Sequence, residues 1–322
     1  MTESVIYPEI NSPSAKISVQ QRIRRLIWKI AGATLILMAI GSATRVMDAG
    51  LACPDWPLCY GQLVPSQQMN LQVFLEWFHR LDAALIGLTT LWLVGLCVWF
   101  RRQLPRWLVG ASLLALLLVI GQGVLGGLTV TELLRFDIVT AHLGTALLFF
   151  SVLIAMGTAL LPYQGTTTAK KLPWVGGIAV ALVYLQSLLG GLIASRWAVR
   201  QCFTGFELCS VMNTHLMGVL PATLATLAVV IFSWRTPALH PALRKLANLC
   251  GVFLVLQILV GFATFHLHLQ VEPLTVTHQA VGAALLGGLV AYTVLAVRDR
   301  AIECPQVWGN RPLAPNSGGN TP

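Results

Sequence analysis

Charged residues are scarce in this sequence. Asp, Glu, Lys and Arg together make up 10% of its 322 residues, whereas about a quarter of the residues of a soluble globular domain are charged. Hydrophobic residues make up 56%. This balance excludes an ordinary soluble domain and predicts a polytopic membrane protein.

Several motifs with a known chemical purpose are also absent. No Cys-x-x-Cys-His occurs, which excludes covalent c-type haem attachment. No Asp-rich motif that would bind a magnesium diphosphate is present, so a prenyl transfer is not expected. The basic residues form no patch interleaved with aromatic residues, and we expect no nucleic-acid partner. No apolar stretch precedes the first arginines, so no cleavable signal peptide is expected.

Apolar runs of about 20 residues, the length that crosses a bilayer as a helix, occur eight times. They cover residues 26–45, 77–100, 107–129, 138–161, 173–195, 211–234, 246–265 and 274–297. The sequence therefore predicts an all-α integral membrane protein with eight transmembrane helices in the lipid bilayer of the plasma membrane.

The basic residues predict the orientation of these spans, because Lys and Arg concentrate on the cytoplasmic side. Of the 21, 16 fall at one side, and the alternate connections hold only Arg45, Arg80, Arg135, Arg196 and Arg200. Both termini are thus expected in the cytoplasm, with 1–25 as an N-terminal segment and 301–322 as a disordered tail. Eight of the 12 acidic residues lie at the opposite, outer ends of the spans, where we expect the chemistry.

Four histidines lie just inside the outer ends of the even-numbered spans. His79 and His142 are 63 residues apart, as are His215 and His278, and the two pairs are offset by 136. This spacing predicts two pseudo-symmetric four-helix bundles, covering 26–165 and 166–300. Because each half has an even number of spans, the repeat is parallel, with its axis along the membrane normal.

Small residues recur at the same depth in the odd-numbered spans. The motifs are Gln122-x3-Gly126, Gln186-x3-Gly190, Gln257-x3-Gly261 and, in the first span, Gly41-x2-Thr44. Such residues let helices, or a flat ligand, approach closely.

The repeat fails around the first histidine. Glu76, Arg80 and Asp82 share this helix mouth with His79, and charged groups in or near lipid usually mark a site. The equivalent positions in the second half are Met212, Leu216 and Gly218. This difference indicates that the first half has acid/base chemistry available, whereas the second offers ligation alone.

One inward histidine on each of two facing helices is a typical axial clamp for haem iron. The two pairs therefore predict two porphyrin positions. Zinc is less favoured, because each half offers two histidines and no third ligand at an obvious spacing.

Two cysteine pairs occupy corresponding outer loops, where disulfides persist. They are Cys53 with Cys59, and Cys202 with Cys209. We interpret them as structural disulfides that brace lids over the histidine sites; the alternative is that Cys53 and Cys59 form a redox-active pair or a transient nucleophile beside Glu76.

Together these motifs resemble the heme A synthase family, over about residues 22–300. The segments that carry the resemblance are Gly50-Leu-Ala-Cys53-Pro-Asp-Trp-Pro-Leu-Cys59-Tyr-Gly61, Glu76-Trp-Phe-His79-Arg80, Thr140-Ala-His142, Asn213-Thr-His215 and Thr277-His278. The resemblance implies an oxidoreductase that converts haem O into haem A by oxidising the C8 methyl of the porphyrin to a formyl group.

By the same resemblance, His79 and His142 bracket the substrate haem O, and His215 and His278 ligate a resident haem b that relays electrons. Glu76 is implied as the catalytic carboxylate. From their position at the outer surface, Arg80, Arg135, Arg196 and Arg200 are candidate propionate-binding residues. Expected partners are a haem O synthase that delivers the substrate and an electron donor that the sequence does not identify; a homo-oligomer is compatible with it.

Two other readings use the same residues. A di-haem b-type cytochrome that carries electrons to or from quinone would explain four histidines but gives the Glu76 cluster no purpose. A haem or small-molecule transporter would place its site at the midplane, whereas the histidines here lie at the outer ends of the spans.

Overall fold

The computed structural model describes residues 13–193, 206–267 and 270–301. Within these ranges the secondary structure is helical, and eight helices are long and apolar enough to cross a membrane. Their bounds are α1 Pro13–Val46, α2 Leu71–Trp99, α3 Arg106–Thr131, α4 Phe136–Ala159, α5 Leu172–Ile193, α7 Phe206–Arg235, α8 Pro241–His266 and α9 Glu272–Ala301. The prediction of eight spans in an all-α, multi-pass membrane protein is confirmed.

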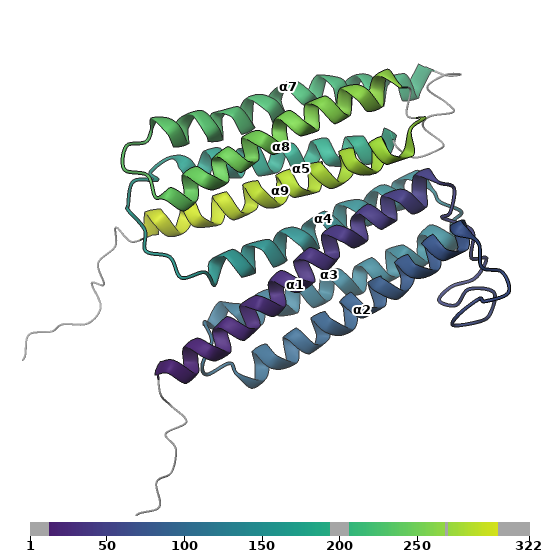
Figure 1. Ribbon diagram of the computed structural model, residues 1–322, viewed down its shortest axis with the longest axis horizontal. Coiled ribbons are helices and arrows are strands. Elements are labelled where there is room, and N and C mark those ends of the chain that lie inside the picture. Colours follow the sequence, from purple (N-terminus) through teal and green to yellow (C-terminus); the bar gives the residue numbers. More distant parts are fainter. Residues whose placement is uncertain (1–12, 194–205, 268–269, 302–322) are drawn as a thin grey trace, which may run out of the picture.

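The helices form two adjacent groups of four (Figure 1). One group contains α1, α2, α3 and α4, and the other contains α5, α7, α8 and α9. Helix α9 is the most buried of the eight and contacts α1, α4, α5 and α8. The start of α1 and the end of α9 lie at the same end of the bundle in Figure 1. That this end faces the cytoplasm, and that the two groups repeat one another, stay predictions.

The helix boundaries follow from local capping. Helix α2 begins six residues before the predicted apolar run, because the Asn70 side chain accepts a hydrogen bond from the Val73 N–H and caps the first turn. Pro241 occupies the first turn of α8, where a missing N–H does no harm. The early start of α2 makes Glu76 part of the second helical turn.

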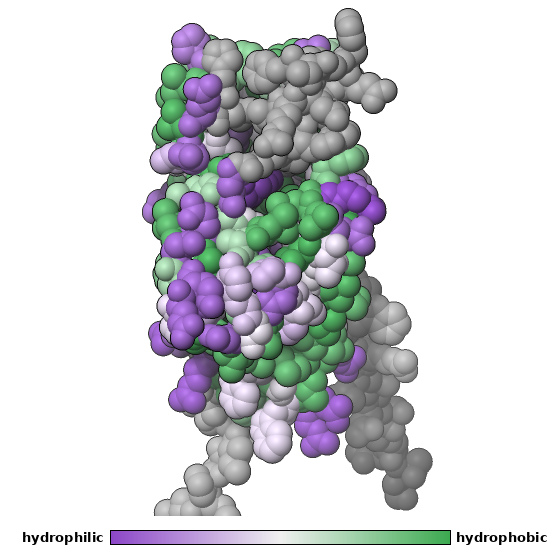
Figure 2. Space-filling model, turned by 90° about the vertical axis from the view of Figure 1, so that its right-hand side faces the viewer, coloured by the Kyte–Doolittle hydropathy of each residue, from purple (hydrophilic) through white to green (hydrophobic). Residues whose placement is uncertain are grey.

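The surface of the helices is suited to lipid. Large apolar side chains such as Leu88, Trp92, Leu117 and Phe262 are exposed along the outward faces of the helices. Figure 2 looks at the end of the bundle that carries the loop 47–70, and there hydrophilic and hydrophobic residues are interspersed. Apolar exposure on the flanks with mixed polarity at the end is typical of a membrane-spanning bundle.

A buried carboxylate joins the two groups at the opposite end. Asp299 of α9 is fully buried and accepts hydrogen bonds from the Tyr163 hydroxyl at 2.9 Å and the Thr166 amide at 2.8 Å. It also accepts from the amides of Thr168 and Ala169, at 3.0 and 3.1 Å. Burial, together with this carboxylate, raises the pKa of Tyr163. The connection between α4 and α5 is thus fastened to α9.

Candidate active site

Each of the four histidines lies against a glycine of a neighbouring helix. A Cβ atom added at Gly41 would come 2.8 Å from Cε1 of His79, and one added at Gly261 would come 2.7 Å from Cε1 of His278. His215 and His142 lie in the same way against Gly190 and Gly126, at 3.1 and 3.5 Å. The recurring glycines of the odd-numbered spans therefore make room for the imidazole rings.

The histidines also meet in the predicted pairs. His79 and His142 lie within range of a direct electrostatic interaction with each other, and so do His215 and His278. Each pair joins two helices of one group, and both pairs lie toward the end of the bundle that carries the loop 47–70. Among the described residues no group of three or more histidine, cysteine or acidic side chains converges on one point. The pairwise arrangement fits an axial clamp, and the role of the four residues as ligands stays a prediction.

A cavity of about 760 Å³ lies beside the second pair. Its walls come mainly from α5, α7, α8 and α9, and His215 and His278 are among the lining residues. Most of the other lining side chains are apolar, and the polar ones include Arg45, Gln186, Gln257, Thr275 and Gln279. Volumes of 300 to 1,000 Å³ with apolar walls and a few placed polar groups are usual for cofactor sites.

Glutamines fix the two rings of this cavity. The side-chain nitrogen of Gln186 lies 3.0 Å from Nδ1 of His215 and 2.7 Å from its backbone oxygen. Gln257 lies 3.3 Å from Nε2 of His278. A metal-bound histidine usually donates its second ring N–H to an oxygen acceptor, which sets the orientation of the ring, and the side-chain oxygens of these two glutamines are acceptors of that kind.

The donor set fits a porphyrin iron. As placed, the Gln186 amide nitrogen donates to Nδ1 of His215, so a metal at Nε2 would require the other ring tautomer, with Nδ1–H facing the amide oxygen. Nδ1 of His278 and Oε1 of Gln257 are buried without partners in the described part of the chain. These two atoms are a complementary donor and acceptor, and pairing them would move the Gln257 amide nitrogen away from Nε2 of His278 and leave that nitrogen for a metal.

The rings of the first pair are held differently. The amide of Gln122 donates to the backbone oxygen of His142 at 2.8 Å rather than to its ring. In α1 the position four residues before Gly41 is Leu37, so the glutamine of the other three motifs is missing there. Nδ1 of both His79 and His142 is buried without a hydrogen-bond partner among the described residues. No glutamine side chain in this range fixes these two rings.

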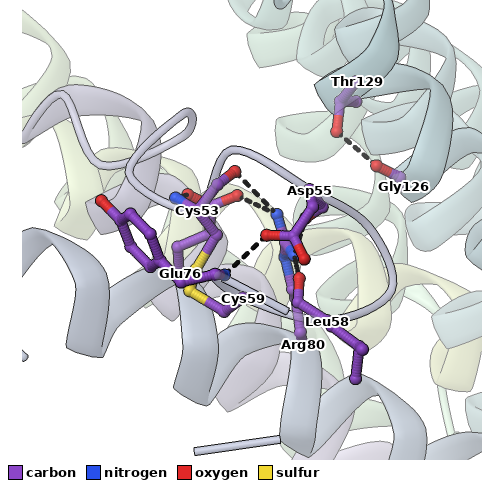
Figure 3. Close-up of polar contacts among 9 residues, drawn as sticks. Cys53, Asp55, Leu58, Cys59, Glu76, Arg80, Gly126 and Thr129 are labelled. Carbon is purple, nitrogen blue, oxygen red and sulfur yellow. Dashed lines mark hydrogen bonds and ion pairs between the residues drawn. A yellow bond between two sulfur atoms is a disulfide. The ribbon is translucent and has the colours of Figure 1, made fainter. Parts of the chain in front are cut away.

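In the first group, Glu76 and Arg80 lie near the start of α2, against the loop 47–70 (Figure 3). Glu76 is 4% exposed, and its two carboxylate oxygens have different partners. Oε2 accepts a hydrogen bond from the Cys53 amide at 2.8 Å, and Oε1 pairs with Arg80 at 2.5 Å. Arg80 in turn donates to the carbonyls of Asp55 and Leu58, both at 2.6 Å. Glu76 and Arg80 thus attach the loop 47–70 to α2.

The loop itself is closed by a disulfide between Cys53 and Cys59, which confirms that part of the prediction. The Asp55 carboxylate accepts from the amides of Tyr60 and Gly61, and the Trp56 indole lies 3.3 Å from the Cβ position of Gly127 on α3. The loop therefore extends from α2 toward the helix that carries Gly126. A redox role for this cysteine pair stays a prediction.

Other predicted residues lie elsewhere. Arg135 is exposed and pairs with Asp137 at 2.8 Å and Glu132 at 3.4 Å; the pairing with Asp137 raises the pKa of Arg135. Arg196, Arg200 and Cys202 lie outside the described residues, and of Cys209 only the backbone is described. The sequence reasoning missed Arg45, whose place one helical turn beyond Gly41 was the available signal.

A comparison with known families adds the decisive observation. Residues 24–290 match the COX15-CtaA family, described as cytochrome oxidase assembly protein. The chain belongs to this family. The match runs from within α1 to within α9, and it confirms the membership that the loop and histidine motifs indicated.

Curated relatives match over most of their length. The heme A synthase of Shewanella oneidensis is 27% identical over 312 residues, which cover 79% of this chain and 90% of the relative. The heme A synthase of Caulobacter vibrioides is 26% identical over 83% of this chain and 94% of its own. That of Rhodospirillum centenum is 27% identical over 84% and 88%.

Proposed function

We propose that this chain is a heme A synthase of the plasma membrane, an oxidoreductase that converts haem O into haem A. The C8 methyl of the porphyrin is oxidised in steps, through a hydroxymethyl group, to a formyl group. The observation that carries the proposal is the combination of two half-buried histidine pairs with one buried carboxylate, Glu76, which among the described residues accompanies the first pair and not the second, in a member of this family.

The two histidine pairs are assigned different tasks. His215 and His278 would hold a resident haem b, because their rings are fixed by glutamines and line a cavity of suitable size. His79 and His142 would bracket haem O, because a substrate must enter and leave and these rings have no glutamine side chain fixing them. Bound haem b supplies one-electron transfer chemistry. Residues 26–165 are then the substrate half and 166–300 the cofactor half.

Glu76 is the proposed catalytic group. It is the buried carboxylate of the substrate half, three residues before His79 and therefore on the same helical face. Oxidation of a methyl group releases protons and develops positive charge next to the ring. A buried carboxylate can accept the protons and stabilise the positive charge. Arg80 holds the Glu76 carboxylate in place through Oε1.

Replacing Glu76 by Gln tests this assignment. Gln keeps an oxygen that can accept from the Cys53 amide, so the loop stays attached, but it removes the negative charge. We expect haem A formation to fall by about 100-fold or more, the usual range for general acid–base catalysis, with haem O or the hydroxylated intermediate accumulating. Chromatography of the extracted pigments measures all three.

Glu76→Asp is the matched control, since it keeps the charge on a shorter side chain, and it should retain more activity than Glu76→Gln. An unchanged haem A yield in Glu76→Gln would contradict the acid/base role. Two stoichiometric haem b groups with quinol activity and no porphyrin product would instead favour a di-haem cytochrome.

A further inference from the structure

Arg45 crosses from one group of helices to the other. It belongs to the last turn of α1, yet its side chain lines the cavity that contains His215 and His278. Its Nη2 donates a hydrogen bond to Oε1 of Gln279 at 2.8 Å. Gln279 directly follows His278, and its own amide donates to the Met38 carbonyl of α1 at 3.4 Å. The guanidinium is therefore positioned by the neighbour of a proposed iron ligand.

The positive charge of Arg45 has no matching carboxylate in the described part of the chain. The ion pairs found there involve Arg80 and Arg135. The Nε–H of Arg45 is buried and has no hydrogen-bond partner among the described residues. Guanidinium nitrogens act only as donors and stay protonated, and leaving a buried donor of a charged group without an acceptor is unfavourable. The cavity rim at Arg45 is therefore suited to an anion.

A second unpaired donor lines the same cavity. The hydroxyl of Thr275 is buried and has no partner in the described ranges, and Thr275 is 7% exposed. It lies four residues before Gln279 on α9, so the two residues share a helical face. A carboxylate has oxygens for two such donors, whereas a neutral apolar ligand would leave both unsatisfied.

We propose that Arg45 and Thr275 form a carboxylate subsite that binds a propionate group of the porphyrin in the second cavity. The inference rests on the proposed function, which places a haem there, and it adds a binding contribution from α1 of the substrate half. Arg80 is already bonded to Glu76 and to loop carbonyls, and Arg135 to two surface acids. Among these three arginines, Arg45 is the one that forms no ion pair with a residue that the structure describes.

The test compares haem b with an ester in which both propionates are methylated and uncharged. Protein is produced in cells unable to make haem and is then loaded in detergent with haem b or with its dimethyl ester. Wild-type protein should bind haem b more tightly than the ester. Arg45→Gln should weaken haem b binding by about tenfold or more, the usual effect of removing a hydrogen bond to a charged group, and should leave ester binding almost unchanged. Arg45→Lys should lie between.

Thr275→Val should act in the same direction by a smaller factor, and two substitutions serve as controls. Ser42→Ala removes a buried hydroxyl that has no partner among the described residues but does not line the cavity. Arg106→Gln removes an exposed arginine at the opposite end of the bundle. Neither should change the affinity for haem b.

The outcomes separate this inference from the proposed function. Equal weakening of haem b and ester in Arg45→Gln would overturn the propionate contact and make Arg45 a structural residue. No weakening of either would also overturn it. A haem b spectrum that survives His278→Ala would instead contradict the cofactor site itself, and with it the division between the halves.

Discussion

At Gly261 the missing side chain lets the His278 imidazole reach the backbone of α8. The Cβ of an alanine would come 2.7 Å from Cε1 and 3.1 Å from Nδ1 of the ring, so His278 would have to move. Because ring orientation determines where Nε2 points, a shift of a few tenths of an ångström is enough to weaken axial ligation.

We therefore expect Gly261→Ala to lower the haem b content of the purified protein several-fold or to shift its absorption bands. Gly251→Ala is the control on the same helix, because there the nearest atom lies at an ordinary 3.4 Å. Both changes raise helix propensity by up to about 1 kcal/mol, so a loss confined to Gly261→Ala reports on the ring. Equal spectra for the two variants would show that His278 tolerates displacement.

Residue spacing alone located the histidines and the acidic cluster, because a regular interval can be recognised in the sequence without knowing how the helices pack. It did not reveal that Glu76 holds the loop backbone at Cys53, since that contact joins residues 23 positions apart. Nor did it place Arg45 in the second cavity. The end of α1 that carries Arg45 contacts the second group of helices because of how the two groups pack. The periodicity of the sequence gives no information on that packing.

At the scale of elements, hydropathy determined the number of helices but not their ends. A run of apolar residues measures the part of a helix inside lipid, and capping residues such as Asn70 extend it into the interface. The loop 47–70 could be predicted as braced by a disulfide, yet its second fastening through Arg80 to the carbonyls of Asp55 and Leu58 required the structure.

The fastening of the α4–α5 connection to α9 leads to a prediction about stability. Asp299 accepts hydrogen bonds from backbone amides and from Tyr163. Asn in its place removes the charge and turns one acceptor into a donor that faces other donors. We expect Asp299→Asn to destabilise the protein by roughly 2 to 4 kcal/mol.

Thermal unfolding in detergent can be followed with a thiol-reactive dye that reports exposure of the buried Cys97 and Cys250. Glu132→Gln is the control, because its pair with Arg135 is exposed and such pairs contribute about 0 to 1 kcal/mol. If both variants unfold at the wild-type temperature, Asp299 does not hold the connection against α9.

At the scale of the whole molecule, α1 contributes residues to both proposed sites. Gly41 touches the His79 ring, and Arg45, one turn further along, lines the cavity of His215 and His278. The contact of Gln279 with Met38 joins the same stretch of α1 to α9. The proposed substrate and cofactor sites are therefore neighbours across α1, and under that proposal electrons would pass between them within one chain.

This arrangement predicts how defective chains behave together. His79→Ala should keep the haem b spectrum and make no haem A, whereas His278→Ala should lose that spectrum and leave haem O unoxidised. When both variants are produced in the same cell, each intact site lies in a different chain, separated by lipid-facing helices unless the chains associate closely. Haem A should then stay below a few per cent of the wild-type level.

Wild-type chains produced beside His79→Ala chains control for expression and should make haem A. If the two defective variants together restore haem A formation, electrons pass between chains and not across α1 within one chain.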